Sequence, residues 1–323
     1  MKAILVNQCG GPEKMELVEV AKPSPRPGQV LVKLAAIGVN FIDIYFRTGL
    51  YKAPVPVSLG MEGAGVVEAV GAGVEGIKTG DRVAYCMVRG AYAEYAVVPA
   101  EMIVPIPAAL DFEAAAAAML QCMTAHYFTH STYALKPGDA CLVHAAAGGT
   151  GRLIVQMAKM RGALVIGTAS TREKAALATK AGADEMILYT ECEFDQEVKR
   201  LTGGRGVDVV YDSVGAATFA RSLDSLRPLG MMVTFGNASG AVPAVEPLLL
   251  NQKGSLYLTR PALGHYVATR EELLGRANDV LGWVASGKLK LRIDRTYPLA
   301  KAAQAHIYLA CRATSGKLLL LPA

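Results

Sequence analysis

The sequence has no hydrophobic run long enough to cross a membrane. Its longest apolar stretch, residues 114–120, is short and rich in alanine, whereas a spanning helix needs about 20 apolar residues. The apolar start, residues 1–6, is followed by Gln8 and the turn at 10–12, too early for the core of a signal peptide. We therefore expect a soluble, cytoplasmic protein without a membrane partner.

Cysteine pairs and runs of basic residues are also missing. None of the six cysteines belongs to a C-x-x-C pair, which favours free thiols in a reducing compartment. The net charge of +5 is modest and Lys and Arg form no run, so a nucleic-acid partner is not expected. The cysteines are Cys9, Cys86, Cys122, Cys141, Cys192 and Cys311.

Apolar residues are abundant enough to form large cores. Hydrophobic residues make up 52% of the chain and charged residues 19%, a balance that argues against disorder. A length of 323 residues exceeds the usual size of one hydrophobic core, so two domains are expected.

The pattern of expected elements changes along the chain. Short strand-like segments between Gly and Pro turns fill the first third and predict an antiparallel barrel or sandwich. After a helix that Asp111 is placed to cap, apolar strands alternate with helices, which indicates a parallel sheet covered on both faces. Six such strands fit a doubly wound dinucleotide-binding domain of the Rossmann type. They are predicted at 141–144, 164–167, 185–188, 207–211, 231–235 and 255–258.

The C-terminal stretch is too short to form a domain of its own. We therefore expect it to return to the first domain, so that the nucleotide-binding domain is an insertion. The predicted bounds are 1–122 for the first part of the catalytic domain, 123–262 for the nucleotide-binding domain and 263–323 for the return.

The strongest motif follows the first Rossmann strand. After His144 the chain reads A-x-x-G-x-x-G, a variant of the dinucleotide fingerprint, at the start of a predicted helix. Small residues are needed there because the backbone approaches the pyrophosphate closely, and the helix N-terminus offers free N–H groups. We expect Gly148, Gly149, Thr150 and Gly151 to hold the pyrophosphate.

The end of the second Rossmann strand favours NADPH over NADH. NAD-binding domains place an Asp or Glu about 20 residues after the glycine loop to hold the ribose hydroxyls. Here no acidic residue ends the strand, and residues 167–174 read GTASTREK. Ser170, Arg172 and Lys174 are placed to receive a 2′-phosphate, whereas Glu173 is expected to face elsewhere.

Ligand-binding loops of this fold follow the carboxyl ends of the strands. Three later segments have that position, and we predict that they contact the nicotinamide or ribose side of the cofactor. Their candidate residues are Ser213, Phe235, Gly236, Asn237, Ser239, Leu258 and Arg260.

Five motifs resemble the medium-chain dehydrogenase/reductase superfamily. They are Gly38-Val39-Asn40, Gly60-Met61-Glu62, Gly80-Asp81-Arg82-Val83, the loop 145–151 and Ala181-Gly182-Ala183-Asp184. The resemblance implies an α/β protein in which a doubly wound, parallel six-stranded Rossmann domain is inserted in a GroES-like, mainly antiparallel β-barrel domain.

The same resemblance shows what the catalytic site lacks. In the alcohol dehydrogenases of this superfamily, zinc-binding Cys and His stand at the positions of Asn40 and Met61, and four cysteines for structural zinc follow. Here these ligands are replaced, so no metal is expected, and Glu62 is interpreted as a structural group.

A closer resemblance is to the zeta-crystallin-like quinone oxidoreductases. Segments 40–51, 210–215 and 251–257 resemble that family, and the likeness extends to 312–317. It implies that Asn40 and Tyr45 act in catalysis and on the nicotinamide side, with Asp43 between them. It further implies cofactor contacts by Thr124, Gly148, Gly149, Gly151, Ser170, Lys174, Tyr189, Phe235, Asn237, Leu258 and Arg312.

Two departures from that family are visible. Thr150 stands where the family usually has Val, a change that the loop should tolerate. Gln121-Cys122 replaces a segment that is often Lys-Gly. This segment is expected near the substrate mouth and bears on the choice of acceptor.

The missing zinc defines the expected chemistry. Without a Lewis acid the acceptor must already be electrophilic, as quinones and α,β-unsaturated carbonyl compounds are. The main hypothesis is an NADPH-dependent quinone reductase with direct hydride transfer, in which Tyr45 or water donates the proton. The alternatives are an NADPH-dependent alkenal or enone reductase, and a non-catalytic NADPH-binding sensor, structural or RNA-binding protein.

Two further expectations concern the remaining features. The strand at 255–259 should form the edge of the Rossmann sheet, and the family pairs this strand across a two-fold axis, so a homodimer is expected. His126 and His130 are spaced i, i+4 on a predicted helix without an H-E-x-x-H pattern, which favours packed or surface histidines over metal ligands.

Overall fold

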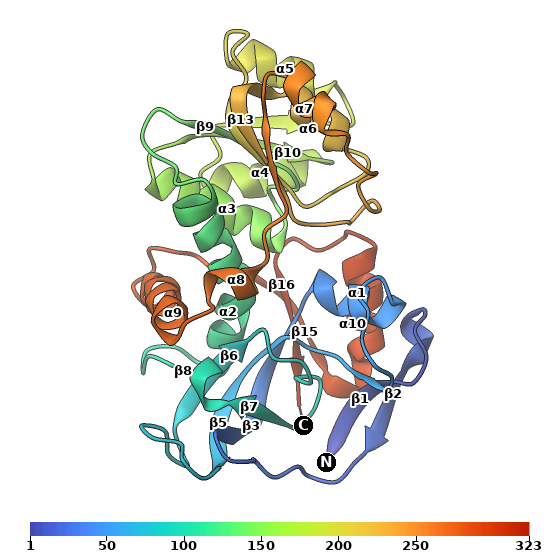
Figure 1. Cartoon of the computed structure of the whole chain (residues 1–323), viewed down its shortest axis with the longest axis vertical. Helices are drawn as coiled ribbons and strands as arrows, with labels where there is room; N and C mark the ends of the chain where they lie inside the picture. Colours follow the sequence, from blue (N-terminus) through green and yellow to red (C-terminus); the bar gives the residue numbers. More distant parts are fainter. Residues whose placement is uncertain (323) are drawn as a thin grey trace. The chain divides into compact units, whose positions relative to one another are not determined.

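The chain builds one unit from its two end segments and a second unit from its middle. The computed structural model describes residues 1–322. Met1–Met123 and the segment from Tyr266 onward form the first unit, and Thr124–His265 form the second. The blue and red segments in Figure 1 both belong to the first unit.

The first unit is mainly antiparallel. Its strands are β1 (Lys2–Val6), β2 (Met15–Glu19), β3 (Gln29–Val39), β4 (Val57–Ser58), β5 (Glu62–Val70), β6 (Arg82–Cys86), β7 (Tyr95–Pro99), β8 (Val104–Pro105), β15 (Ile293–Pro298) and β16 (Lys317–Leu321). The larger sheet has the order β15-β16-β3-β5-β6-β8, with β7 paired to β3, and a smaller sheet has the order β2-β1-β4. Strand β16, from the C-terminal segment, pairs antiparallel with β3 from the N-terminal segment. The expected, mainly antiparallel first domain is confirmed.

Four longer helices accompany these sheets. They are α1 (Phe41–Thr48), α2 (Phe112–Tyr127), which continues into the second unit, α9 (Arg270–Ala285) and α10 (Ala302–Ala310). Short helices are η1 (Pro12–Lys14), η2 (Ala100–Met102), η4 (Leu299–Lys301) and α8 (Leu263–Tyr266). One core joins β1, β3, β5, β16 and α10, and buried Ile4, Val32, Ile37, Ala305 and Leu318 belong to it. The return of the chain therefore completes this core.

The second unit is a doubly wound parallel sheet. Its strands are β9 (Ala140–Val143), β10 (Leu164–Ala169), β11 (Glu185–Leu188), β12 (Val207–Asp212), β13 (Leu226–Thr234) and β14 (Tyr257–Thr259). Its helices are η3 (Phe128–Thr132), α3 (Gly149–Met160), α4 (Arg172–Lys180), α5 (Phe194–Leu201), α6 (Phe219–Asp224) and α7 (Pro247–Gln252). The strand order β11-β10-β9-β12-β13-β14 is the Rossmann order, with its switch point between β9 and β12. The predicted six-stranded Rossmann domain is confirmed.

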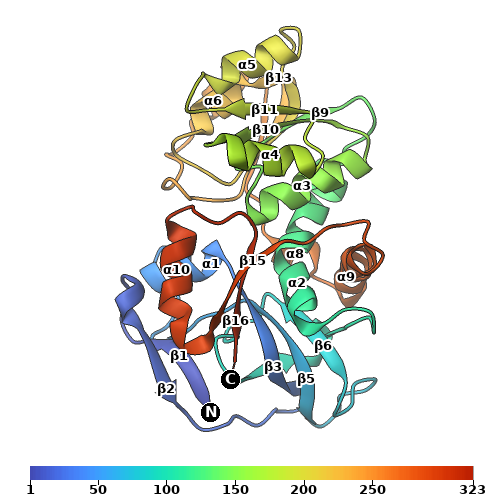
Figure 2. The same cartoon turned by 180° about the vertical axis from the view of Figure 1, so that it is seen from behind.

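Helices cover both faces of this sheet. In Figure 2, α3 and α4 lie on one face, and α5 and α6 on the other. Every residue of β9 and of β12 is buried, which is why these strands show no alternation of apolar and exposed polar residues. Phe194, Val198, Phe219 and Leu223 of α5 and α6 belong to the same buried core cluster as Leu142 of β9.

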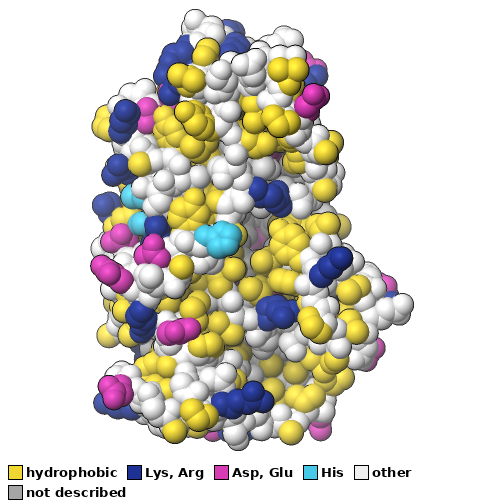
Figure 3. Space-filling view, in the orientation of Figure 1, with side chains coloured by type: hydrophobic (Ala, Val, Ile, Leu, Met, Phe, Trp, Pro, Cys, Tyr) yellow, Lys and Arg dark blue, Asp and Glu magenta, His cyan; other side chains and the backbone are white. Residues whose placement is uncertain are grey.

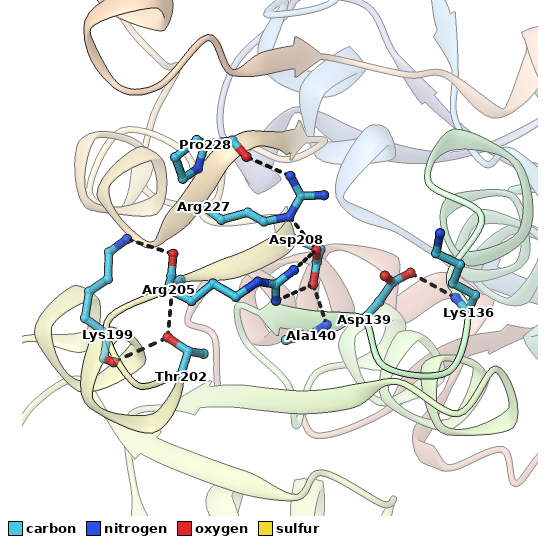
Figure 4. Close-up of polar contacts among 10 residues, drawn as sticks. Lys136, Asp139, Ala140, Lys199, Thr202, Arg205, Asp208, Arg227 and Pro228 are labelled. Atoms are coloured by element: carbon cyan, nitrogen blue, oxygen red, sulfur yellow. Dashed lines mark hydrogen bonds and ion pairs between the residues drawn. The ribbon is translucent and has the colours of Figure 1, made fainter.

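A charged cluster fixes the amino ends of three strands of the sheet. Asp208, in β12, accepts hydrogen bonds from Arg205 at 2.6 Å and from Arg227 at 2.5 Å, and Figure 4 shows both guanidinium groups reaching it. Its second oxygen accepts from the Ala140 backbone N–H of β9 at 2.8 Å. Ligands bind at the opposite, carboxyl end of such sheets, so this cluster is structural.

The surface offers no extended area of one charge on the side seen in Figure 3. There Lys and Arg side chains lie apart from one another among hydrophobic and uncharged groups. None of the helices within residues 1–322 combines the length and the hydropathy of a membrane span.

Candidate active site

The turn after β3 fixes the first candidate residues. β3 ends at Val39, and Asn40 is the N-cap of α1. The Asp43 carboxylate accepts a hydrogen bond from the Asn40 backbone N–H at 2.8 Å, which satisfies a donor at the helix start. α1 ends at Gly49, whose φ of 80° is a left-handed conformation that favours glycine.

A buried lysine and a buried glutamate hold the side chain of Asn40. Asn40 Nδ2 donates to Glu62 Oε1 at 2.7 Å, and Lys317 Nζ donates to Asn40 Oδ1 at 2.8 Å. Lys317 also forms an ion pair with Glu62, and the two side chains are 3% and 0% exposed. The other Glu62 oxygen accepts from the Leu120 backbone N–H of α2 at 2.6 Å. The segments that carry Asn40, Glu62 and Lys317 are far apart in sequence and meet at the Asn40 side chain.

A second buried network of hydrogen bonds starts at Asp43. Asp43 Oδ2 accepts from the Tyr92 hydroxyl at 3.1 Å, and that hydroxyl lies 2.9 Å from His306 Nε2. Arg47 Nη1 lies 3.1 Å from His306 Nδ1, and Arg47 Nε donates to Gly10 O. Because arginine only donates, His306 Nδ1 is the acceptor, and His306 Nε2 carries the proton that it donates to Tyr92.

Burial sets the protonation states of Asp43 and His306 in this second network. Burial raises the pKa of Asp43 to about 7, although the hydrogen bond from Asn40 N–H acts in the opposite direction. Burial and the Arg47 guanidinium lower the pKa of His306 to about 3, so this histidine is neutral near pH 7. Within residues 1–322 the buried Asp43 Oδ1 has no hydrogen-bond partner, which favours a protonated carboxyl over a carboxylate.

Tyr45 belongs to a group of packed aromatic rings. Its ring centroid lies 5.2 Å from that of Tyr51 and 6.3 Å from that of Phe41. Burial by these neighbours leaves the side chain 8% exposed. The structure thus places Asn40 and Asp43 in hydrogen-bonded networks, and it places the Tyr45 ring among packed aromatic rings. The catalytic roles of all three residues stay predictions.

The groups around Asn40 do not suit a zinc ion. The amide oxygen of Asn40 already accepts from an ammonium group, and Glu62 is paired with that same ammonium. Met61 is buried, and its thioether is not among the Cys, His and carboxylate ligands that zinc selects. Across the described 322 residues, no group of three or more His, Cys, Asp or Glu is arranged to hold a metal ion.

The phosphate loop of the second unit is shaped by close backbone packing. Gly148 is the N-cap of α3, which starts at Gly149. A Cβ on Gly151 would collide with the carbonyl oxygen of Ala145, and that oxygen accepts from Gly148 N–H at 2.8 Å. The first turn of α3 carries no acidic side chain, so its N–H groups suit an anion. These features fit a dinucleotide pyrophosphate, with Thr150 in the same turn.

The end of β10 has the composition expected for a 2′-phosphate site. Ser170 follows the strand, and Thr171 caps α4 by accepting from Lys174 N–H at 3.3 Å. Hydrogen bonds from its own backbone N–H and from Thr171 hold the pKa of Glu173 below its usual range, so this acid is engaged at the helix cap.

Two exposed side chains flank that position. Tyr189 follows β11, its N–H donates to Ala169 O at 3.3 Å, and its side chain is exposed. Arg172 forms only a loose ion pair with Glu191 at 3.5 Å, and both side chains are exposed. Both Tyr189 and Arg172 therefore have the accessibility that contact with an adenosine phosphate requires.

A buried histidine links the carboxyl ends of three strands beneath these loops. His144 Nδ1 lies 3.0 Å from Thr168 Oγ1, and Nε2 lies 2.9 Å from Ser222 Oγ. Ser222 donates to Asp212 Oδ2 at 3.0 Å, and Asp212 Oδ1 accepts from Gly215 N–H at 3.1 Å. Burial lowers the pKa of His144, so it serves as a neutral link that fixes the ends of β9, β10 and β12.

The loops after β12 and β13 lie against each other. A Cβ on Gly236 would collide with Ser213 O, so glycine is required for this approach. The Ser239 hydroxyl donates to Val214 O at 2.8 Å and accepts from Ala217 N–H at 3.0 Å. The Ser239 hydroxyl thus joins the two loops. The cofactor contact that the sequence predicts for Ser239 stays a prediction.

The next residues connect the same loop to β14 and to η3. The Asn237 amide donates to Gly236 O at 2.9 Å and accepts from Arg260 Nη2 at 3.1 Å. The Phe235 ring lies 4.6 Å from that of Phe128. The structure thus brings four of the predicted second-unit residues, Ser213, Phe235, Gly236 and Asn237, to the carboxyl edge of the sheet.

The remaining predicted residues belong to other elements. Thr124 in α2 and Leu258 in β14 are half-buried, and Arg312 follows α10 with a φ of 56° and is exposed. The imidazoles of His126 and His130 are stacked with centroids 4.3 Å apart, as suits packed histidines. The cofactor-binding roles of the whole predicted set stay predictions.

Sequence reasoning missed the groups that surround Asn40 and Asp43. Tyr92 and His306 belong to none of the motifs that suggested a site, and Arg47 and Lys317 were only parts of matching segments, with no role assigned to them. The one available signal was Lys317, a charged residue that opens the otherwise apolar strand β16.

Known families match both units. Residues 26–108 match the alcohol dehydrogenase GroES-like domain, and residues 149–273 match the family described as zinc-binding dehydrogenase. Quinone oxidoreductase 1 of Escherichia coli is 48% identical, over 97% of each chain. The quinone oxidoreductase of Pseudomonas aeruginosa is 48% identical over 99% of each chain.

Other relatives and solved structures agree. The 2-haloacrylate reductase of a Burkholderia species is 44% identical, over 99% of this chain and 98% of the relative. The crystal structure of E. coli quinone oxidoreductase complexed with NADPH superposes with a TM-score of 0.98 at 47% identity, with 100% of both chains covered. The chain therefore belongs to the quinone oxidoreductase family of the medium-chain dehydrogenase/reductase superfamily.

Proposed function

We propose that this protein is an NADPH-dependent quinone reductase that transfers hydride without a metal ion. The observation that carries the proposal is the Asn40 site, where a lysine ammonium and a glutamate hold the side-chain amide at the position of a zinc ligand in the related alcohol dehydrogenases. Full-length similarity to proteins named quinone oxidoreductase, one of them solved with NADPH, supports the same reading.

The second unit supplies the residues that would hold the cofactor. The Gly148–Gly151 turn and the start of α3 suit the pyrophosphate, and Ser170 and Lys174 suit the 2′-phosphate. When bound, NADPH supplies a hydride from C4 of its nicotinamide. His144 and Asp212 act indirectly, because they hold the ends of the strands that carry these loops.

The first unit supplies orientation and protons. Asn40 orients the acceptor or the nicotinamide through its amide, and Tyr45 or water donates the proton that the reduced acceptor takes up. Quinones suit this site because their reduction gains aromaticity and needs no Lewis acid. Positioning of the quinone against the nicotinamide then accounts for most of the rate acceleration of hydride transfer.

Stopped-flow oxidation of NADPH by 1,4-benzoquinone tests the proposal. We expect rapid loss of NADPH absorbance and much slower loss with NADH, because the end of β10 has no acid for the ribose hydroxyls. If no quinone is reduced, the proposal is wrong. Tight NADPH binding without turnover would then support the non-catalytic alternative.

A second candidate is reduction of activated carbon–carbon double bonds. The 44% identity to a 2-haloacrylate reductase favours it, and the changed Gln121-Cys122 segment bears on the choice between the two kinds of acceptor. A panel of quinones and short enones at equal concentrations separates the candidates. We expect the larger kcat/KM with quinones, and a larger value with enones would reverse the assignment.

We also propose a homodimer formed through β14. This strand ends the sheet order of the second unit, and Tyr257 on it is 59% exposed, with Leu229 on the neighbouring β13 57% exposed. Light scattering should give twice the chain mass, and Tyr257→Lys should give the monomer. A wild-type monomer at micromolar concentration would contradict the proposal.

A cytoplasmic location is the last part of the proposal. The cysteines of the described chain are free, as expected in a reducing compartment. Fractionation of cells that express the tagged chain tests it, with recovery outside the cytoplasm as the contrary result.

A further inference from the structure

We propose that the buried Glu62–Lys317 ion pair is a positioning device for Asn40, which it holds in one amide orientation with a second N–H left to donate to the acceptor oxygen. This inference rests on the proposed function, because it assigns a task to Asn40 in quinone reduction. It concerns Glu62 and Lys317 as positioning residues.

The contacts allow only one orientation of the amide. Lys317 donates to Oδ1 at 2.8 Å, and Glu62 accepts from Nδ2 at 2.7 Å. An ammonium group only donates and a carboxylate only accepts. A rotation of the Asn40 amide by 180° would place its NH₂ against the ammonium and its oxygen against the carboxylate, so the ion pair excludes that state.

One N–H of the amide remains available. The nitrogen carries two hydrogens, and only one is donated to Glu62. No acceptor for the second is present in the part of the chain that the structure describes. Asn40 is 5% exposed, so a ligand that reaches it meets a nearly desolvated donor, which stabilises charge on an oxygen more than a donor in water does.

The charge of Lys317 strengthens this donor. An ammonium on the carbonyl oxygen polarises the amide, and linked hydrogen bonds of this kind reinforce one another. The backbone of the same residue is held separately, since Asp43 accepts from Asn40 N–H at 2.8 Å. Side chain and backbone are thus fixed by two different sets of contacts.

Stability alone does not account for a buried ion pair. Replacing such a pair by neutral groups of similar volume is often neutral or stabilising, whereas removing one partner leaves an uncompensated charge and is strongly destabilising. A double-variant cycle therefore separates a positioning role from a structural one.

The experiment compares Glu62→Gln, Lys317→Met and the double variant with the wild type. Each single variant should lower Tm, and the double variant should recover most of the loss. Its kcat with 1,4-benzoquinone should stay about 100- to 1,000-fold below wild type, as for loss of one fixed donor, while the KM for NADPH stays unchanged. Recovery of both Tm and kcat would overturn the proposal.

The matched control is the exposed pair Lys22–Glu68 in the same unit, joined at 2.6 Å. Lys22→Met with Glu68→Gln should leave Tm and kcat unchanged. An equal loss of kcat in this control would show that the effect is not specific to Asn40, and would count against the proposal.

A measurement on the wild-type protein keeps the test independent of activity and of variant folding. The side-chain amide signals of Asn40 in ¹H–¹⁵N NMR, assigned by their loss in Asn40→Ala, should show one hydrogen protected from exchange and one unprotected. Equal exchange of both would overturn the proposal. If no quinone is reduced but this asymmetry is present, the proposed function fails while the fixed orientation stands.

Discussion

At the residue scale, Asp43 shows how burial decides chemistry. It was expected between two catalytic residues, and the structure places it fully buried, in contact with Asn40 N–H and the Tyr92 hydroxyl. Burial raises its pKa to about 7. The folded protein therefore holds a proton on Asp43 between about pH 4 and pH 7 that the unfolded chain releases.

This pKa makes stability depend on pH. Because the folded state binds this proton in that window, the Asp43 contribution to the free energy of unfolding should fall as pH rises from 4 to 7. The lowered pKa of His306 contributes with the opposite sign, so the Asp43 part is measured as a difference between the wild type and Asp43→Asn. Asp43→Asn should remove this part of the slope, a difference on the order of 4 kcal/mol over the whole window. Urea unfolding of both proteins at pH 5 and pH 7.5 measures it, and identical slopes would contradict the assignment.

Substitution of Lys174 tests the predicted preference for NADPH over NADH, also at the residue scale. Its position after the acid-free end of β10 predicts contact with the 2′-phosphate, so Lys174→Ala should raise the KM for NADPH about tenfold, or 1.4 kcal/mol. The KM for NADH should stay unchanged. Lys180→Ala, in the last turn of the same helix, is the control, and an equal effect of both substitutions would remove Lys174 from the site.

The sequence predicted local site features better than distant ones. Gly148 and Gly151 are recognisable because the loop is contiguous and its glycines meet a steric need. Asn40 and Lys317 are separated by 277 positions, and Glu62 and Lys317 by 255. No spacing rule connects residues that only the paired strands β3, β5 and β16 bring together.

At the element scale, buried parallel strands were the most predictable. Every residue of β9 and β12 is buried because both faces of the sheet are covered, and apart from the two partnered aspartates of β12 the side chains of these strands are mostly apolar. Strand β13 begins at Leu226, earlier than the predicted 231. Pro228 and Gly230 resemble turn signals, and Leu229 has a φ of 60° within the strand, so sequence propensity and tertiary pairing disagree there.

The edge strand shows a smaller difference of the same kind. The sequence predicted 255–258, and β14 spans Tyr257–Thr259. Ser255 has a φ of 55°, a left-handed conformation that does not belong to an extended strand. Tertiary contacts around Gly254 impose that turn, since Gly254 O accepts from Leu229 N–H at 2.8 Å.

Substitution of Asp208 tests whether its hydrogen bonds hold the amino ends of β9, β12 and β13 together. Although burial acts to raise it, hydrogen bonds from Arg205, Ala140 N–H and Arg227 keep the pKa of Asp208 below its usual range. Asp208→Asn should lower the free energy of unfolding by about 2 kcal/mol, as for loss of a charged hydrogen bond. Chemical denaturation measures this loss. NADPH affinity should stay unchanged, and a loss of affinity without a loss of stability would contradict a structural role.

At the scale of the whole molecule, the C-terminal return completes the first unit. Strand β16 pairs with β3 and carries Lys317 to Glu62 on β5. The sequence predicted the return because the last segment is too short to fold alone. The lone Lys317 at the start of an apolar run was visible in the sequence. That its ammonium group would contact Asn40 was not predictable, because the contact depends on sheet order.

The central claim is hydride transfer from NADPH to a quinone without a metal ion. Its most direct test is stopped-flow oxidation of NADPH by 1,4-benzoquinone with protein dialysed against a strong chelator, compared with protein supplied with Zn²⁺. We expect rapid NADPH oxidation at the same rate in both samples. No oxidation with any quinone, or activity that chelation abolishes and Zn²⁺ restores, would contradict it.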